Sequence, residues 1–95
     1  MHPVVSYGKF LLPEGVEAVR CSMPGSVWKV LVEQGQQVKK GETIIIEESM
    51  KMEFPQHATC DGYVASIHVK PGDEVHAGQL IVGIMEEKEE AVSIK

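Results

Sequence analysis

A single lysine, Lys51, stands between two methionines in the stretch "EESMKMEF" (residues 47–54). A lysine amine becomes a nucleophile when it loses its proton, and it can then take up an activated acyl group. The run "TIIIEE" precedes the lysine and "MEFPQ" follows it, and both are typical of strands. Lysine itself is uncommon in strands. We therefore expect Lys51 at the tip of a β-hairpin, exposed to solvent.

The residues in and around this stretch also have simpler interpretations. A lone lysine in a turn is usually an ordinary surface charge, and methionines usually fill cores. A strand would place Met50 and Met52 on one face, partly buried beside the lysine. Trp28 is expected to be a core aromatic between sheets, with a contact surface as the alternative.

Nothing else in the chain forms a recognisable catalytic or metal-binding pattern. No carboxylate pair, triad or metal cluster can be placed, so we expect the chain not to be an enzyme by itself. Two cysteines, Cys21 and Cys60, are too few for a disulfide framework and are expected to be reduced. The four histidines lack the spacing of a zinc site. Two of them, His57 and His76, are expected to be exposed.

An internal repeat is the strongest organising feature. Residues 21–47 and residues 58–84 align without a gap, each position 37 residues from its counterpart. Three glycines of the first copy fall on glycines of the second, with β-branched residues interleaved between them. Two copies indicate a compact domain with two-fold pseudo-symmetry rather than a long repeat array. The glycine pairs are Gly25 with Gly62, Gly35 with Gly72, and Gly41 with Gly78.

Each copy has the pattern of β structure. Apolar and polar residues alternate around "VWKVLV" and "VASIHV", which is the period of a half-buried strand. "EQG" and "KPGD" supply turns, because glycine permits positive φ and proline presets it. No segment of ten residues or more reads as a helix. The fold class is therefore all-β, a sandwich or flattened barrel, and Lys51 lies in the segment that joins the two copies.

At this point the sequence resembles a known family. "EESMKMEF" is similar to the attachment motif of biotinyl (biotin carboxyl carrier) domains, which commonly reads E-A-M-K-M. The flanking "MPGSVWKVLVEQGQQVKKGE" and "DGYVASIHVKPGDEVHAGQLI" extend the resemblance over most of the chain. Met-Lys-Met alone is a weak signal, but at the joint of a β repeat it is a strong one. Ser49 replaces the usual alanine, which is a small-for-small change. Gln36 stands where the second copy has Asp73, so the first turn is expected to be looser.

The resemblance implies a fold, a site and a function. The implied fold is a flattened β-barrel, or barrel-sandwich hybrid, of two four-stranded antiparallel sheets. Biotin–protein ligase would attach biotin covalently to Lys51, between Met50 and Met52, and would supply the deprotonation. Glu48 would belong to the ligase-recognition surface. The chain would be a biotin carboxyl carrier, a subunit or domain of a biotin-dependent carboxylase that moves a carboxyl group from biotin carboxylase to carboxyltransferase. The gapless repeat leaves no room for a "thumb" loop, which implies the thumbless type.

Composition narrows the partners and the location. Hydrophobic residues are 43% and charged residues 24%, as in ordinary globular proteins, and the net charge of −5 argues against nucleic acid. No signal peptide or membrane-spanning run is recognisable, so no membrane partner and a cytoplasmic location are expected. We divide the chain into an N-terminal extension (1–18), the biotinyl domain (19–85) and an acidic tail (86–95). The apolar residues of the extension suggest that it packs on the domain.

Two other functions stay open at this point. A lipoyl carrier shares the fold and the hairpin lysine, but its motif is usually D-K-A. An unmodified adaptor of the same fold would need no acceptor lysine, so its Met-Lys-Met would be a coincidence. The carboxyl acceptor is not specified by the sequence.

Overall fold

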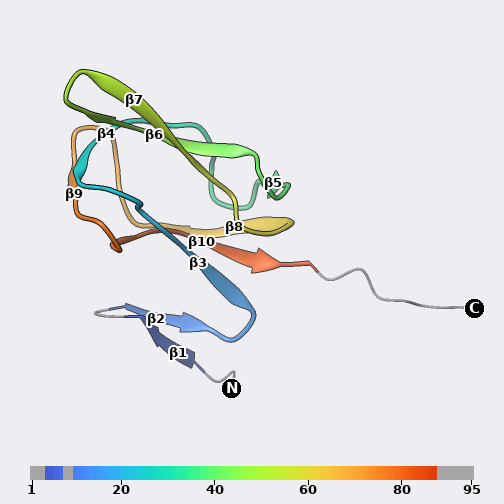
Figure 1. Ribbon diagram of the computed structural model, residues 1–95. Helices are drawn as coiled ribbons and strands as arrows, with labels where there is room; N and C mark the ends of the chain where they lie inside the picture. The colour runs from blue at the N-terminus through green and yellow to red at the C-terminus, as the bar shows by residue number, and fades with distance from the viewer. Residues whose placement is uncertain (1–3, 8–9, 88–95) are drawn as a thin grey trace, which may run out of the picture.

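The computed structural model describes residues 4–7 and 10–87, and the regular secondary structure in these residues is all β (Figure 1). Short strands follow one another with tight turns between them, as the alternating pattern predicts. The strands are β1 (Val4–Tyr7), β2 (Phe10–Pro13), β3 (Val16–Arg20), β4 (Gly25–Val30), β5 (Gln37–Val38), β6 (Thr43–Ser49), β7 (Met52–His57), β8 (Gly62–Ile67), β9 (Glu74–Val75) and β10 (Leu80–Glu86).

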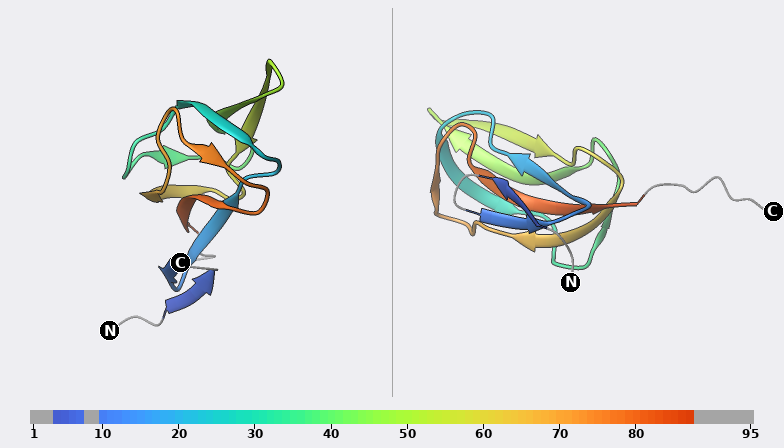
Figure 2. Two further views of the ribbon diagram at one scale, coloured as in Figure 1. Left: turned by 90° about the vertical axis from the view of Figure 1, so that its left-hand side faces the viewer. Right: turned by 90° about the horizontal axis from the view of Figure 1, so that it is seen from below.

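Two four-stranded antiparallel sheets face each other, which confirms the predicted fold class. One sheet has the order β7-β6-β4-β9 and contains the strands on both sides of Lys51, so we call it the lysine sheet. The other has the order β3-β10-β8-β5 and contains β3 and β10, which come first and last in the chain among the eight strands of the two sheets, so we call it the terminal sheet. Figure 2 shows the two layers and the β6–β7 hairpin that projects from them.

The sequence repeat becomes a structural two-fold relation. A shift of 37 positions carries β4, β5 and β6 onto β8, β9 and β10, and it carries β3 onto β7. Each sheet therefore combines strands from both copies. The irregularities repeat as well, because the register shift beside Trp28 in β4 has its counterpart beside Ala65 in β8. Turn glycines Gly35 and Gly72 have φ angles of 89° and 95°, so the first turn has the same conformation in both copies.

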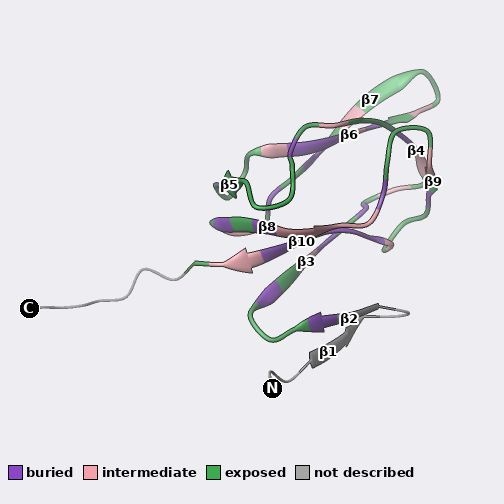
Figure 3. Cartoon of the chain, turned by 180° about the vertical axis from the view of Figure 1, so that it is seen from behind, coloured by how far each residue is buried: buried purple, intermediate pink, exposed green. Residues whose placement is uncertain are grey.

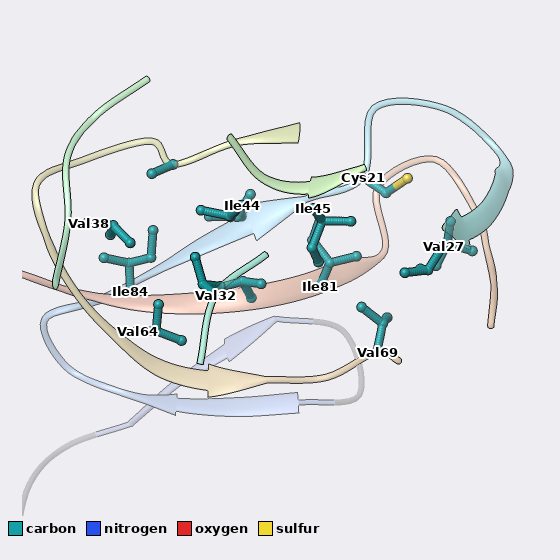
Figure 4. Packing of buried hydrophobic residues seen from close by; sticks show 14 residues of the cluster. Cys21, Val27, Val32, Val38, Ile44, Ile45, Val64, Val69, Ile81 and Ile84 are labelled. Carbon is teal, nitrogen blue, oxygen red and sulfur yellow. The ribbon is translucent and has the colours of Figure 1, made fainter. Parts of the chain in front are cut away.

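The core lies between the two sheets and consists almost entirely of small β-branched residues. Side chains from both sheets point toward one another in this layer (Figure 4). Burying such a side chain contributes roughly 1.5–3 kcal/mol, so this layer is the main source of stability. Six apolar residues are almost or completely inaccessible to solvent: Ile44, Ile45, Val64, Ile81, Val82 and Ile84.

Among the described residues, β1 and β2 pair only with each other, and a side chain of β2 contacts the terminal sheet. Leu12 is buried and packs with Val16 and Leu80 on the outer face of that sheet. Figure 3 shows the buried part of β2. The prediction that the extension packs on the domain is thus confirmed for Leu12. Strand β3 begins at Val16, inside the range assigned to the extension. Most of the predicted acidic tail, residues 88–95, lies outside the described residues.

Candidate functional site: the Met50–Lys51 turn

Lys51 lies in the two-residue turn between β6 and β7, as the sequence predicted. Ser49 and Met52 are directly opposite each other in the ladder, so only Met50 and Lys51 form the connection. Their φ angles are +53° and +66°. Positive φ at both central residues of a two-residue hairpin is the type I′ arrangement, whose twist matches that of the strands. The turn lies at the free end of the projecting hairpin (Figure 1).

Both turn residues have an unfavourable backbone conformation. Type I′ turns usually contain Asn-Gly, because asparagine and glycine tolerate the left-handed region, where most other residues cost about 1–2 kcal/mol each. Within the described residues, Met50 and Lys51 are the only residues other than glycine with positive φ. Strain of this kind concentrates at functional sites, where the side chain matters more than the turn. The turn therefore keeps a lysine at a position where glycine would be more stable.

The side chains of this turn extend into solvent. Met50 is 92% exposed and Met52 is 60% exposed. The expectation that both methionines are partly buried on one strand face is wrong, because Met50 belongs to the turn and the hairpin projects beyond the sheet. Lys51 is exposed, and its amine has no hydrogen bond or ion pair among the described residues.

The two glutamates before the turn lie on opposite faces. Glu48 is exposed on the outer face of the lysine sheet, directly opposite Glu53. Glu47 is only 1% exposed and points into the protein. One of its oxygens, Oε1, accepts hydrogen bonds from Cys21 Sγ at 3.0 Å and from Gln56 Nε2 at 3.2 Å. Its other oxygen, Oε2, is buried without a partner among the described residues.

This buried polar cluster was missed by the sequence analysis, although the repeat contained a signal. The repeat places Glu47 on Ile84, a position inside the core. The cluster also affects Cys21: burial, together with the hydrogen bond to Glu47, raises the pKa of the thiol from 9.0 to about 11. Burial also raises the pKa of Cys60. Both cysteines are free thiols, as predicted.

Trp28 differs from its expected position. It is 42% exposed instead of buried between the sheets, and Lys29 Nζ lies 4.6 Å from its ring centroid. The cause is the register shift in β4: Val27 and Lys29 pair with consecutive residues of β6, and Trp28 is left over. The histidines His57 and His76 are exposed, as predicted. Within residues 4–7 and 10–87, no group of three metal-ligating side chains and no helix able to cross a membrane is present.

Two stacked β-sheets, one of which carries an exposed lysine at the tip of a projecting hairpin, define an attachment domain. Comparisons with known proteins agree. A family model described as "Biotin-requiring enzyme" matches residues 17–84. The chain therefore belongs to the biotin-requiring enzyme family, as a biotin/lipoyl attachment domain, and the predicted resemblance is confirmed.

Individual relatives range from small proteins to large enzymes. A protein of Mycobacterium leprae named "Biotinylated protein TB7.3 homolog" is 43% identical over 68 residues, which cover 72% of this chain and 96% of the relative. The pyruvate carboxylase of Bacillus subtilis is 42% identical over 66 residues, 70% of this chain but only 6% of that enzyme. The lipoyl domain of the 2-oxoglutarate dehydrogenase complex of Azotobacter vinelandii has a TM-score of 0.61 at 26% identity. It matches over 75% of this chain and its own full length.

Proposed function

We propose that this chain is a biotin carboxyl carrier and that Lys51 is the residue to which biotin becomes attached. The observation that carries the proposal is the strained turn at the end of a projecting hairpin, where the lysine amine has no partner among the described residues. An exposed, sterically accessible amine fits a covalent cofactor. Family membership supports biotin as that cofactor.

The residues of the turn have separate tasks in the attachment. Lys51 Nζ, once deprotonated by the ligase, attacks the acyl carbon of biotinyl-adenylate, the amide bond forms and AMP leaves. Met50 and Met52 surround the amine with flexible apolar side chains that adapt to different partner surfaces. Glu48 lies on the exposed face below the turn, where a ligase can contact it. The rigid ladder of β6 and β7 keeps the amine away from the body of the domain.

In this proposal the chain carries and does not catalyse. When bound, biotin supplies the chemistry, because its ring accepts a carboxyl group and gives it up again. The projecting hairpin would bring it first to a biotin carboxylase and then to a carboxyltransferase. Pyruvate carboxylase contains a segment similar to this chain, which supports a biotin-dependent carboxylase as the setting. A cytoplasmic location is part of the same proposal.

Lipoate is the alternative cofactor, because the lipoyl domain of the 2-oxoglutarate dehydrogenase complex is similar in fold. The specific observation against it is the pair of methionines around Lys51, where lipoyl domains usually have D-K-A. Biotin is therefore favoured, and one experiment can compare the two.

The test is the intact mass of the chain after incubation with biotin, ATP and a biotin–protein ligase. We expect a gain of one biotinoyl group, mapped by peptide analysis to Lys51. Lys51→Arg should gain nothing, whereas Lys40→Arg, which changes another exposed lysine, should react like the wild type. A gain only with lipoate and its ligase would show that the chain is a lipoyl carrier instead. No gain with either would leave an unmodified adaptor of this fold.

A further inference from the structure

The outer faces of the two sheets are related by the pseudo-symmetry but differ in what covers them. On the terminal sheet, Gly83 lies between Ser66 and Ala18, and Ala65 is the extra residue at the register shift. These residues are small, and Leu12 from the N-terminal hairpin packs on this face. The chain itself therefore covers the outer face of the terminal sheet.

On the lysine sheet, the equivalent positions carry larger apolar groups. Ile46 replaces Gly83, Pro55 replaces Ala18, and Trp28 replaces Ala65. Ile46 pairs with Lys29 on one side and with Pro55 on the other, so the three residues form a row on one face. The Lys29 ammonium lies over the indole ring of Trp28, which places the ring beside this row. No described segment covers this face.

A second row crosses the same face closer to the turn. Glu74, Ser26, Glu48 and Glu53 are consecutive cross-strand partners in β9, β4, β6 and β7. The three glutamates are exposed, and none has an ion pair among the described residues. Like charges directly opposite each other, as in Glu48 and Glu53, destabilise a sheet. The row is therefore suited to basic groups that come from outside the chain.

We propose, on the basis of the proposed function, that this outer face is the docking surface for biotin–protein ligase. Trp28 is its apolar anchor, and the row of Glu74, Glu48 and Glu53 faces lysine or arginine side chains of the ligase. The outer face of the lysine sheet thus becomes a specificity determinant of Lys51 modification.

The reach of an unmodified lysine favours the ligase as the occupant. The bare side chain is short, so the ligase must bring its active site against the turn, and its surface then overlies the strands that carry the turn. At about 3.3 Å per residue along β7, Glu53 lies about 7 Å and Pro55 about 13 Å from Lys51. These two residues are the cross-strand partners of Glu48 and Ile46. A specific interface covers about 800 Å² per partner, roughly 30 Å across, and so extends from the turn to both rows. Once biotin lengthens the stem, a carboxylase can reach it from further away.

The apolar part of this surface is tested by steady-state biotinylation of the full chain with a purified ligase. Trp28→Ala should raise KM about tenfold and leave kcat within about twofold, as expected when a buried anchor is truncated outside the reacting groups. Trp28→Phe, which keeps a ring, should lie in between. The matched control is Tyr63→Ala, which removes an aromatic residue of similar exposure (37%) from the terminal sheet and should leave both constants unchanged.

The charged part is tested separately. The triple variant Glu48→Gln, Glu53→Gln, Glu74→Gln should raise KM and weaken the increase of KM with salt, because screening acts on charge pairs. A control triple variant replaces Glu14, Glu17 and Glu33, which are exposed elsewhere, by glutamine. It should retain the wild-type salt dependence of KM.

The outcomes separate this inference from the proposed function. If the wild type is biotinylated and Trp28→Ala has the same KM as Tyr63→Ala, the docking surface is wrong and the carrier function stands. If the row variant and its control have equal KM values and salt dependences, the assigned charge contacts are wrong. If the wild type takes up no biotin, both proposals fail together.

Discussion

The lysine sheet and the terminal sheet have the same backbone arrangement but differ in how two of their paired strands are connected. In the lysine sheet, β6 and β7 are joined by a strained two-residue turn that carries Lys51. In the terminal sheet, the equivalent strands β10 and β3 pair with the same register but are not joined, because the chain enters before β3 and leaves after β10. The repeat therefore produces the same strand pair twice, and of the two pairs only β6–β7 is closed by a turn that presents a lysine amine.

The difference extends into the core. Beneath the acceptor hairpin lie Glu47, Gln56 and Cys21, linked by hydrogen bonds. The two-fold equivalents in the other half are Ile84, Val19 and Ala58, all buried and apolar. The same backbone therefore accommodates a polar cluster in one half and a hydrocarbon cluster in the other. Exchanging residues between the halves shows what each cluster contributes.

The largest effect on stability is expected when a carboxylate is introduced at Ile84, the repeat equivalent of Glu47. Ile84→Glu places a carboxylate where no side chain equivalent to Cys21 or Gln56 can donate a hydrogen bond, so it should cost about 4 kcal/mol or more. Ile46→Glu, on the partly exposed outer face, is the control and should cost much less. Urea denaturation measures both. Equal losses would show that the Ile84 position tolerates a carboxylate as well as the partly exposed outer face does.

The second largest effect on stability is expected at alkaline pH, where Cys21 titrates and its repeat equivalent, Ala58, does not. Because the pKa of Cys21 is raised to about 11, the folded state keeps a proton that the unfolded chain releases near pH 9. The free energy of unfolding should therefore fall between about pH 9 and pH 11, by about 2–3 kcal/mol for this group. Cys21→Ala, which copies Ala58 of the other half, should remove this part of the decline and leave the part due to Cys60. Identical pH profiles would mean that Cys21 titrates alike in the folded and unfolded states.

The strain at the acceptor turn can be released. Replacing Met50 and Lys51 by Asn-Gly, the preferred type I′ pair, should raise the free energy of unfolding by about 2 kcal/mol, because glycine and asparagine tolerate positive φ. Under the proposed function, the same variant should not be biotinylated, because it lacks Lys51. Thermal and urea unfolding measure the gain, and Glu14→Asn, at the repeat equivalent of Lys51 between β2 and β3, serves as a control. A loss of stability would show that the wild-type turn is not strained.

The sequence predicted the parts of this molecule that depend on local pattern. Period-two alternation, the repeat and its paired glycines were sufficient for the all-β class, the two-fold relation and the position of Lys51, whereas the two four-stranded sheets followed from the family resemblance. It did not predict the exposure of Trp28, because one extra residue in β4 changes which side chains face inward. It also did not predict the burial of Glu47, whose partner Cys21 is 26 residues away and meets it only in the folded state.

The smallest effect is expected from making the polar half apolar. Glu47→Ile alone leaves Gln56 without an acceptor, and Gln56→Val alone removes a donor from a buried carboxylate, so each single change should be destabilising. The double variant copies the Ile84 and Val19 pair and also removes the unpartnered Oε2 of Glu47. It should therefore be about 1 kcal/mol more stable than the wild type. A double-mutant cycle by urea denaturation measures the coupling, with Cys21 still bonded to the Met23 carbonyl oxygen. If the double variant unfolds more readily than either single variant, the polar cluster is required for the geometry under the hairpin, and Lys51 biotinylation should then fall as well.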